Sequence, residues 1–118
     1  MFEFPKTERL CGKTAIGNLM EKGHWGTIQP LKFCYLKRGD GQSVNRVMFS
    51  VPKKYFKRAV MRNLIKRRLR ESYRLQKSLL GEAGVDLMIV YNAPEVVAFD
   101  FLREEVERIL KEVSRLVK

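Results

Sequence analysis

Arg62-Asn63-Leu64-Ile65-Lys66-Arg67-Arg68-Leu69-Arg70-Glu71-Ser72-Tyr73-Arg74 is the segment around which the rest of the chain is arranged. At about 100° per residue, a helix over this segment has two distinct faces. The basic face contains no acid and consists of Arg62, Asn63, Lys66, Arg67, Arg70, Arg74 and Lys77. The opposite face consists of Ile65, Leu69, Ser72, Tyr73, Gln76, Leu79 and Leu80. The segment therefore predicts a helix that packs with one face and meets a polyanion with the other.

A solvated surface is the ordinary explanation of a charged helical face. Such faces mix signs, because a Glu four residues before a Lys or Arg stabilises a helix by a few tenths of a kcal/mol. Here cations recur at every fourth position from Arg62 to Arg74, and like charges at that spacing repel. Only Glu71 relieves this repulsion. The pattern favours an anionic partner over a solvated face.

The composition indicates one domain over residues 1–118, since 118 residues with 45% hydrophobic content can bury a core. The formal net charge is +11, and its distribution is uneven. Between residues 46 and 74, Glu71 is the only acid, against Arg46, Lys53, Lys54, Lys57, Arg58, Arg62, Lys66, Arg67, Arg68, Arg70 and Arg74. A localised positive field of this kind is typical of a nucleic-acid-binding protein.

Other classes find little support in the sequence. No run approaches the roughly 18 apolar residues of a membrane span, and residues 1–6 lack a hydrophobic signal region, so we expect no membrane partner and a cytoplasmic protein. Cys11 and Cys34 have no C-x-x-C spacing, which argues against a metal site. We expect reduced, partly buried thiols, and the sequence leaves a disulfide between them open.

The first half of the chain predicts a helix and two strands. Apolar periodicity indicates a helix over 8–22 that ends at Gly23, followed by a loop. In this loop, packing of Trp25 over the edge of the sheet or helix is favoured over its stacking on a base. Alternation predicts strands over 31–38 and 46–51, and the glycines of the turn at 38–42 predict that these strands form a hairpin.

The second half predicts the remaining elements. The apolar run 85–91, interrupted only by Asp86, indicates a strand buried on both faces. A final helix is capped by Asp100 and has an apolar stripe at Leu102, Val106, Ile109, Val113 and Leu116/Val117. The order α-β-β-α-β-α predicts an α+β fold, a small mixed sheet packed with helices.

The linker Lys53-Lys54-Tyr55-Phe56-Lys57-Arg58 interleaves cations with aromatic residues. Tyr55 and Phe56 either stack on bases while the lysines follow phosphates, or anchor the linker to the core; both interpretations stay open.

We find no set of residues for catalysis by the protein alone. The glycines at 39 and 41 are not followed by the Lys-Ser/Thr of a phosphate-binding loop, and His24 has no acid or nucleophile near it in sequence. Asp86 is the one isolated carboxylate, and a strand-end cap explains it better than chemistry. The sequence therefore predicts no catalytic residue and no metal ligand.

The pattern R-N-x-x-K-R-x-x-R-E-x-x-R at 62–74, preceded by Ser50-Val51-Pro52-Lys53-Lys54 and Lys57-Arg58-Ala59-Val60, resembles the signature of the protein subunit of bacterial ribonuclease P. The resemblance extends more loosely from Glu8 to the closing helix. It implies a left-handed β-α-β crossover around the motif helix, as in certain ribosomal protein domains, where the usual rule would give the right-handed form.

The resemblance implies a non-catalytic subunit of an endoribonuclease. In that family the RNA subunit holds most of the magnesium and cleaves precursor tRNA to free its 5′ end, while the protein contacts the ribonuclease P RNA and the 5′ leader. The charge argument and the motif together give the expected RNA-binding residues as Lys53, Lys54, Lys57, Arg58, Arg62, Asn63, Lys66, Arg67, Arg70 and Arg74. We expect the protein to be a monomer.

The family binds the leader in a cleft between the first helix and the sheet. Ile16 and Met20 stand where many members have Phe, and Tyr91-Asn92-Ala93 stands where members often have a basic residue. Phe33, Tyr35 and Phe49 are expected either to form a stacking floor for the leader or to belong to the core. The main alternative function is a ribosomal or RNA-chaperone protein that binds RNA generally; a protein-only nuclease would need the acid and base that the sequence lacks.

Overall fold

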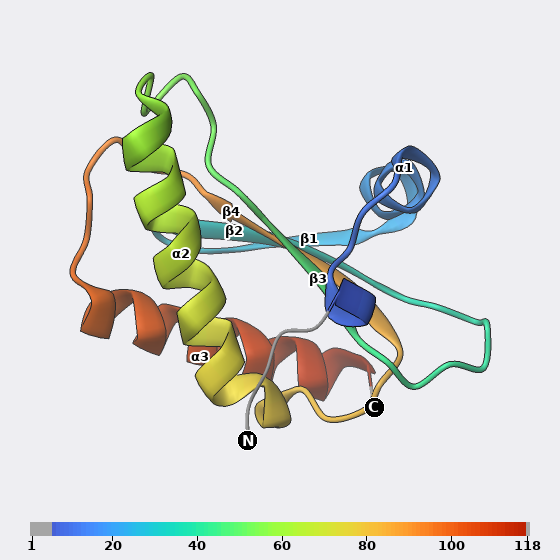
Figure 1. Ribbon diagram of the computed structural model, residues 1–118. Helices are drawn as coiled ribbons and strands as arrows, with labels where there is room; N and C mark the ends of the chain where they lie inside the picture. The colour runs from blue at the N-terminus through green and yellow to red at the C-terminus, as the bar shows by residue number, and fades with distance from the viewer. Residues whose placement is uncertain (1–5, 118) are drawn as a thin grey trace.

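The computed structural model describes residues 6–117 and forms a layered α+β fold. The elements follow the order η1 (Lys6–Glu8), α1 (Lys13–Lys22), β1 (His24–Ile28), β2 (Leu31–Lys37), β3 (Arg46–Ser50), α2 (Ala59–Gln76), η2 (Lys77–Leu79), β4 (Val85–Tyr91) and α3 (Phe99–Val117). Helices α2 and α3 cover one face of the sheet, and α1 lies on the other (Figure 1). The predicted fold class is confirmed.

The sheet has four strands in the order β1-β2-β4-β3. The pairs β1–β2 and β2–β4 are antiparallel, and β3–β4 is parallel. Helix α2 therefore lies in a crossover between parallel neighbours; the hand of this crossover stays a prediction. Six of the seven residues of β4 are buried, which confirms the prediction of a strand buried on both faces.

The predicted hairpin between β2 and β3 is wrong, because β4 lies between them. β4 is the most apolar strand, so it gains most from a neighbour on each side. The segment 38–45 instead crosses the end of β4, where Arg38 N–H donates to the Gly84 carbonyl at 2.9 Å and Gly84 N–H donates to the Ser43 carbonyl at 3.0 Å.

The loop predicted at 23–26 is also wrong, since this stretch begins β1 and pairs with β2. Because glycine is uncommon inside strands, Gly26 led to the prediction of a loop here. A Cβ there would lie 2.4 Å from the ring of Phe33, so the strand accepts only glycine where the aromatic ring crosses it.

Two helix ends also differ from the prediction. Helix α1 begins at Lys13 instead of residue 8, because Leu10 N–H donates to the Val47 carbonyl at 2.9 Å and draws the preceding residues along β3. Helix α3 begins at Phe99, so Asp100 lies in its first turn and is not the cap. At the other end, Leu116 is exposed and does not continue the apolar stripe, whereas Val117 packs against the core.

The sheet separates two hydrophobic clusters. The larger cluster lies under α2 and α3 and includes Val47, Leu87 and Ile89 from the strands. The smaller cluster lies under α1 and joins Leu10 and Leu19 to Cys34 and Met88. Both cysteines are free: Cys34 is buried, which raises the pKa of its thiol, whereas Cys11 is exposed and not part of the core.

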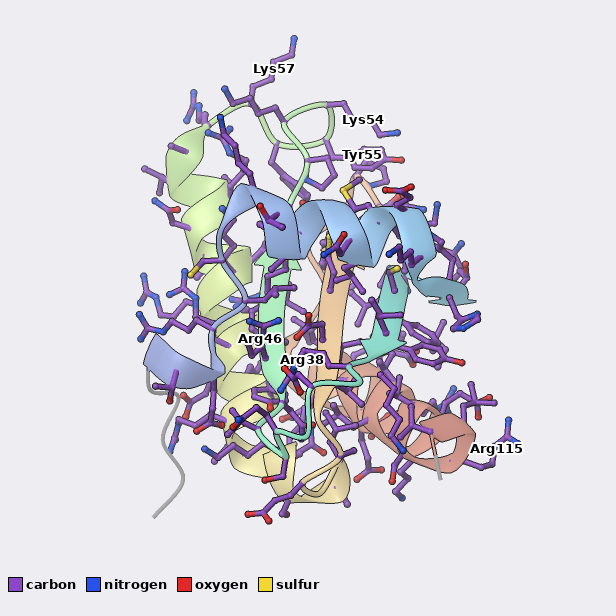
Figure 2. All side chains as sticks on the ribbon, turned by 90° about the vertical axis from the view of Figure 1, so that its right-hand side faces the viewer. Arg38, Arg46, Lys54, Tyr55, Lys57 and Arg115 are labelled. Atoms are coloured by element: carbon purple, nitrogen blue, oxygen red, sulfur yellow. The ribbon has the colours of Figure 1, made fainter. Side chains whose placement is uncertain are left out.

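Asp86 is buried at the start of β4 and is held by two arginines. Arg46 donates to both carboxylate oxygens at 2.8 Å, and Arg38 Nη1 donates to Oδ1 at 2.8 Å. The two arginines approach each other on the sheet face below α1 (Figure 2). Asp86 therefore ties β2 and β3 to the strand between them, and its hydrogen bonds raise the pKa of Arg46.

Candidate nucleic-acid interface

Helix α2 packs with the face that the sequence predicts. Ile65, Leu69 and Tyr73 are buried against the larger cluster. The buried polar side chains on this face find partners: Ser72 Oγ donates to the Arg68 carbonyl at 2.8 Å, and Gln76 Nε2 donates to the Arg103 carbonyl at 3.0 Å. Leu79, predicted on the same face, is exposed instead. The position of α2 is thus fixed without its basic face.

The middle of the basic face is left unpaired. Asn63, Arg67 and Arg70 are exposed, and Lys66 is half-exposed. Within residues 6–117, none of the cations Lys66, Arg67 and Arg70 forms an ion pair. The predicted i,i+4 repulsion is therefore present in the folded protein.

At the two ends of the basic face, Arg62 and Arg74 have partners within the chain. Arg62 Nη1 donates to the carbonyls of Phe56 and Lys57, both at 2.8 Å, so its guanidinium fixes the segment that precedes α2. At the other end, Arg74 Nε donates to Glu71 at 2.9 Å, and this hydrogen bond holds the pKa of Glu71 below its usual value. The unpaired part of the face thus extends from Asn63 to Arg70.

The 51–58 loop extends the positive surface beyond the start of α2. Lys53, Lys54, Lys57 and Arg58 are all exposed. The labelled residues Lys54, Tyr55 and Lys57 gather at the end of the molecule beyond α1 (Figure 2). The first turn of α2 contains no acid, so the positive end of the helix dipole adds to the field of these cations.

The two aromatic residues of this loop have different positions. Phe56 is buried, and its ring meets the ring of Tyr91 edge-on with centroids 5.8 Å apart, so it anchors the loop to the core. Tyr55 is half-buried; its hydroxyl donates to Asn92 Oδ1 at 3.4 Å, and Lys54 Nζ lies 4.8 Å from its ring centroid. Only Tyr55 keeps aromatic surface near the solvent.

Of the two roles expected for Phe33, Tyr35 and Phe49, the structure supports packing in the core, because these side chains face away from α1. All three belong to or pack against the larger cluster under α2 and α3, and Phe33 is 3% exposed. Strand alternation correctly placed them on one face, but it does not say which helix covers that face. On α1, Ile16 packs on the smaller cluster, whereas Met20 is exposed.

The sheet face on the α1 side carries a different set of residues. A cross-strand row runs over all four strands through residues paired in register, namely Thr27, Lys32, Val90 and Ser50. Trp25, predicted to cover an edge, lies on the same face and is 47% exposed. The alternation of β2 places Lys32 on the face of Cys34, but without knowledge of β1 there was no reason to connect Lys32 with Trp25.

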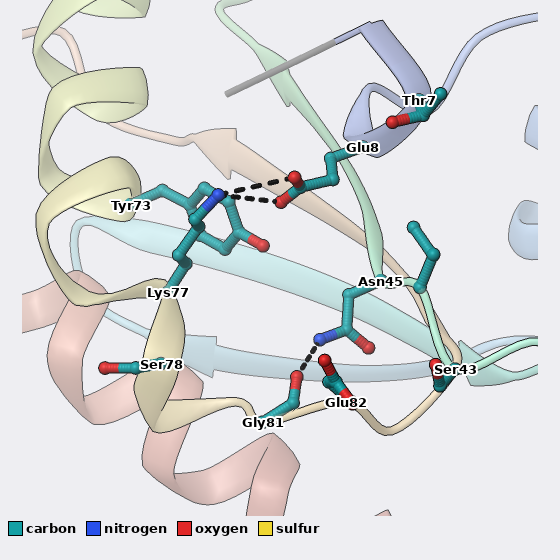
Figure 3. A pocket seen from close by; sticks show the side chains of 10 residues that line it. Thr7, Glu8, Ser43, Asn45, Tyr73, Lys77, Ser78, Gly81 and Glu82 are labelled. Atoms are coloured by element: carbon teal, nitrogen blue, oxygen red, sulfur yellow. Dashed lines mark hydrogen bonds and ion pairs between the residues drawn. The ribbon is translucent and has the colours of Figure 1, made fainter. Parts of the chain in front are cut away.

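A cavity of about 430 Å³ lies at the C-terminal end of α2, between η1 and the segments at 43–45 and 81–82 (Figure 3). Lys77 Nζ contacts Glu8 at 3.1 Å across it, and Asn45 Nδ2 donates to the Gly81 carbonyl. Tyr73 lines the cavity with its ring, and burial raises the pKa of its hydroxyl. The first contact joins the end of the α2 region to η1, and the second joins the segment before β3 to the segment before β4.

Residues 6–117 contain neither a cluster of metal ligands nor a membrane-spanning helix. No group of three or more His, Cys, Asp or Glu side chains in this range is arranged to hold a metal ion. No helix in the same range has the length and apolar character needed to cross a membrane.

Comparison with known proteins gives a consistent result. The family model for ribonuclease P matches residues 4–114. The ribonuclease P protein component of Porphyromonas gingivalis is 33% identical over 113 residues, covering 93% of this chain and 82% of the relative. That of Ralstonia pickettii is 38% identical over 124 aligned positions, covering 95% and 83%.

Solved structures agree with these relatives. The RNase P protein from Thermotoga maritima superposes with a TM-score of 0.75 at 25% identity, covering 89% of this chain and 96% of that one. The RNase P protein of Staphylococcus aureus superposes with a TM-score of 0.77 at 23% identity, covering 91% and 95%, and shows the same fold.

Proposed function

The chain belongs to the ribonuclease P protein family, and we propose that within this endoribonuclease complex it binds the RNA subunit through α2 and the 51–58 loop and contacts the 5′ leader of precursor tRNA. The observation that carries the proposal is the unpaired positive charge of Lys66, Arg67 and Arg70, continued by the exposed cations of the loop. RNA phosphates neutralise such charges and release counterions.

The proposal assigns the bond-breaking chemistry to the RNA subunit. Magnesium ions held mainly by that RNA would supply the activated nucleophile and the charge stabilisation for cleavage of the precursor. The residues of this chain act by position: the cations around Arg67 reduce the repulsion between the ribonuclease P RNA and the precursor tRNA. Less magnesium is then needed to bring the two RNAs together.

Contacts to phosphates position an RNA without specifying its sequence. We therefore expect weak sequence discrimination and a steep salt dependence, with a log–log slope of roughly −0.7 to −0.9 for each phosphate contact. Acting as one domain over residues 1–118, the protein would serve as a monomer in the cytoplasm, since a net charge of +11 opposes self-association.

The test is cleavage of a 5′-extended precursor tRNA at low magnesium by a bacterial ribonuclease P RNA, with and without the protein, beside a protein-only control. We expect efficient cleavage only when RNA and protein are both present. If the protein binds the RNA but leaves the cleavage rate unchanged, it acts as a general RNA-binding protein of the ribosomal or chaperone type. Cleavage by the protein alone would overturn the assignment of catalysis to the RNA.

A further inference from the structure

The two edges of the sheet differ in how they are covered. At the β3 edge, Arg9 forms a bridge with Val47, and Leu10 N–H donates to the Val47 carbonyl at 2.9 Å. The chain therefore covers part of this edge itself. At the opposite edge, β1 pairs with β2 alone, and no other strand within residues 6–117 lies beside it. Alternate N–H and C=O groups of β1 consequently point outward with no strand to receive them.

The sequence of β1 does not protect this open edge. Proteins usually guard an edge strand with a lysine, a proline, another charged side chain or a bulge. The strand His24–Ile28 contains no lysine, proline or acid, and it pairs with β2 in unbroken register. None of its residues is buried. The edge is therefore accessible to the main chain of another strand.

A groove of about 610 Å³ lies beside this edge, between β1 and α3. Gly26 forms part of its lining. Because a Cβ at this position would lie 2.4 Å from the ring of Phe33, the missing side chain lets that ring line the groove as well. The α3 side of the groove carries three cations and one acid, namely Arg108, Lys111, Arg115 and Glu112. The groove thus joins an apolar floor to a wall with net positive charge.

The cations of this wall are accessible to a partner. The side chains of Arg108, Lys111 and Arg115 are between 61% and 67% exposed. Each pairs with an acid of α3, but pairs at an exposed surface contribute little to stability. An incoming carboxylate can therefore share or replace the acid at small cost.

We propose that β1 binds an extended, acidic segment of another protein, which adds to the open edge as a fifth strand. Main-chain hydrogen bonds hold such a segment, and every second side chain enters the groove, where carboxylates meet the α3 cations. A second copy of this chain is a poorer occupant, because its β1 contains no acid and a net charge of +11 on each copy opposes pairing.

This surface is separate from the basic face of α2. Helix α2 packs over β3, where the rings of Tyr73 and Phe49 lie 6.2 Å apart, and β3 is at the other edge of the sheet. RNA bound along α2 therefore leaves the β1 edge open. The peptide site goes beyond the proposed function and does not depend on it.

The test uses a short peptide of alternating glutamate and valine with the isotope-labelled full-length protein. We expect the NMR amide signals of His24–Ile28 to shift and their hydrogen exchange to slow, while the amides of β3 stay unchanged. Shifts confined to α2 would show that the peptide only imitates RNA phosphates, and would overturn the proposal. A dimer that forms without peptide and protects the same β1 amides would also overturn it, because a second copy would then occupy the edge.

The peptide itself provides a control, since a strand pairs with β1 through only one of its two edges. N-methylation of alternate residues removes the donors of one edge and keeps every charge. One of the two alternately methylated peptides should bind more than about tenfold more weakly, whereas the other should keep its affinity. A loss with both peptides, or with neither, would contradict strand addition.

Substitution tests the role of the α3 cations. Lys111→Ala with Arg115→Ala should weaken peptide binding about fivefold, because two exposed charge pairs with the peptide are lost. Arg67→Ala with Arg70→Ala is the matched control, since it removes the same charge from α2 and should keep the peptide affinity. The reverse result, with the loss in the α2 variant alone, would show that the acidic peptide binds the RNA surface and that the proposal is wrong.

Discussion

Two pairs of arginines in this protein have different surroundings. Arg38 and Arg46 contact a buried carboxylate at the end of the sheet, whereas Arg67 and Arg70 on α2 face the solvent. The Arg38 side chain is 9% exposed and contacts Asp86, whose side chain is 4% exposed. Arg67 and Arg70 are exposed and form no ion pair within residues 6–117. A buried charge requires a partner in the same chain. A row of unpaired charges in water indicates a partner outside the chain.

Helix α3 shows what a solvated charged face looks like in the same molecule. Three of its cations pair with acids one turn away, among them Lys111 with Glu107 at 3.6 Å and Arg108 with Glu105 at 3.8 Å. Helix α2, beside it on the same sheet face, has only the Glu71–Arg74 pair of this kind. The basic face of α2 is therefore not a general property of surface helices in this chain.

Removing Asp86 should have the largest effect, and it acts on the fold alone. Asp86→Ala leaves the buried Arg38 without its carboxylate, so we expect the free energy of unfolding to fall by about 3–5 kcal/mol. Urea denaturation measures this loss. Asp40→Ala is the control, because Asp40 also contacts Arg38 but is 46% exposed, and we expect a much smaller change. A similar loss in both variants would contradict the comparison.

Removing the unpaired cations should act on RNA binding alone. Charge-assisted contacts predict that Arg67→Ala with Arg70→Ala weakens binding of ribonuclease P RNA about 100-fold at low salt. The log–log salt slope should become shallower by about 1.5. Filter binding across salt concentrations measures both quantities.

The matched control is Lys111→Ala with Arg115→Ala on α3, which removes the same charge from exposed, paired positions. We expect little change in affinity from it. Equal losses from the two helices would show that net charge, and not the α2 face, determines binding. A large fall in the melting temperature of the α2 variant would show that its arginines are structural.

Arg62 both holds the segment before α2 and belongs to the basic face, so its substitution should have an intermediate effect. Arg62→Lys keeps the charge but loses the paired donation to the carbonyls of Phe56 and Lys57, so we expect a loss of about 1–2 kcal/mol in the free energy of unfolding. Arg62→Ala should add a loss of RNA affinity to this. If the Lys variant is as stable as wild type, the loop does not depend on the guanidinium.

Releasing Arg74 should have the smallest effect. Glu71→Gln removes its ion-pair partner, and we expect RNA affinity to rise a few-fold at low salt. Arg74 lowers the pKa of Glu71, so the pair is present above the ordinary pKa of 4.5 and is lost as pH falls through the lower folded value. Wild-type affinity should approach that of Glu71→Gln as this happens. No convergence at low pH would contradict the pairing.

Local sequence patterns predicted the individual helices and strands better than the pairing between strands. The period of 3.6 residues gave the packed and basic faces of α2, and the apolar run 85–91 gave a strand buried on both sides. The glycines near position 40 gave a hairpin, but contacts between Arg38 and Gly84, distant in sequence, decided the pairing. Local turn chemistry contains no information about a strand that begins only at Val85.

The candidate site was also predictable only in part from the sequence. Charge spacing identified Lys66, Arg67 and Arg70 without knowledge of the sheet. The second role of Arg62 was not predictable, because carbonyl acceptors occur at every position and leave no mark on the sequence. The position of Trp25 beside Lys32 was not predictable either, because it depends on β1, a strand that the sequence patterns did not predict.

The central position of β4 also has a consequence for the order in which the protein matures. During synthesis from the N-terminus, β3 and the basic helix leave the ribosome before β4, the strand that gives β3 its neighbour. The nascent chain thus exposes the arginines of α2 beside ribosomal RNA while Asp86 is still inside the ribosome. We expect folding to complete only after residue 91 emerges, so that a correctly spaced cationic surface appears late, when the chain is nearly free to leave.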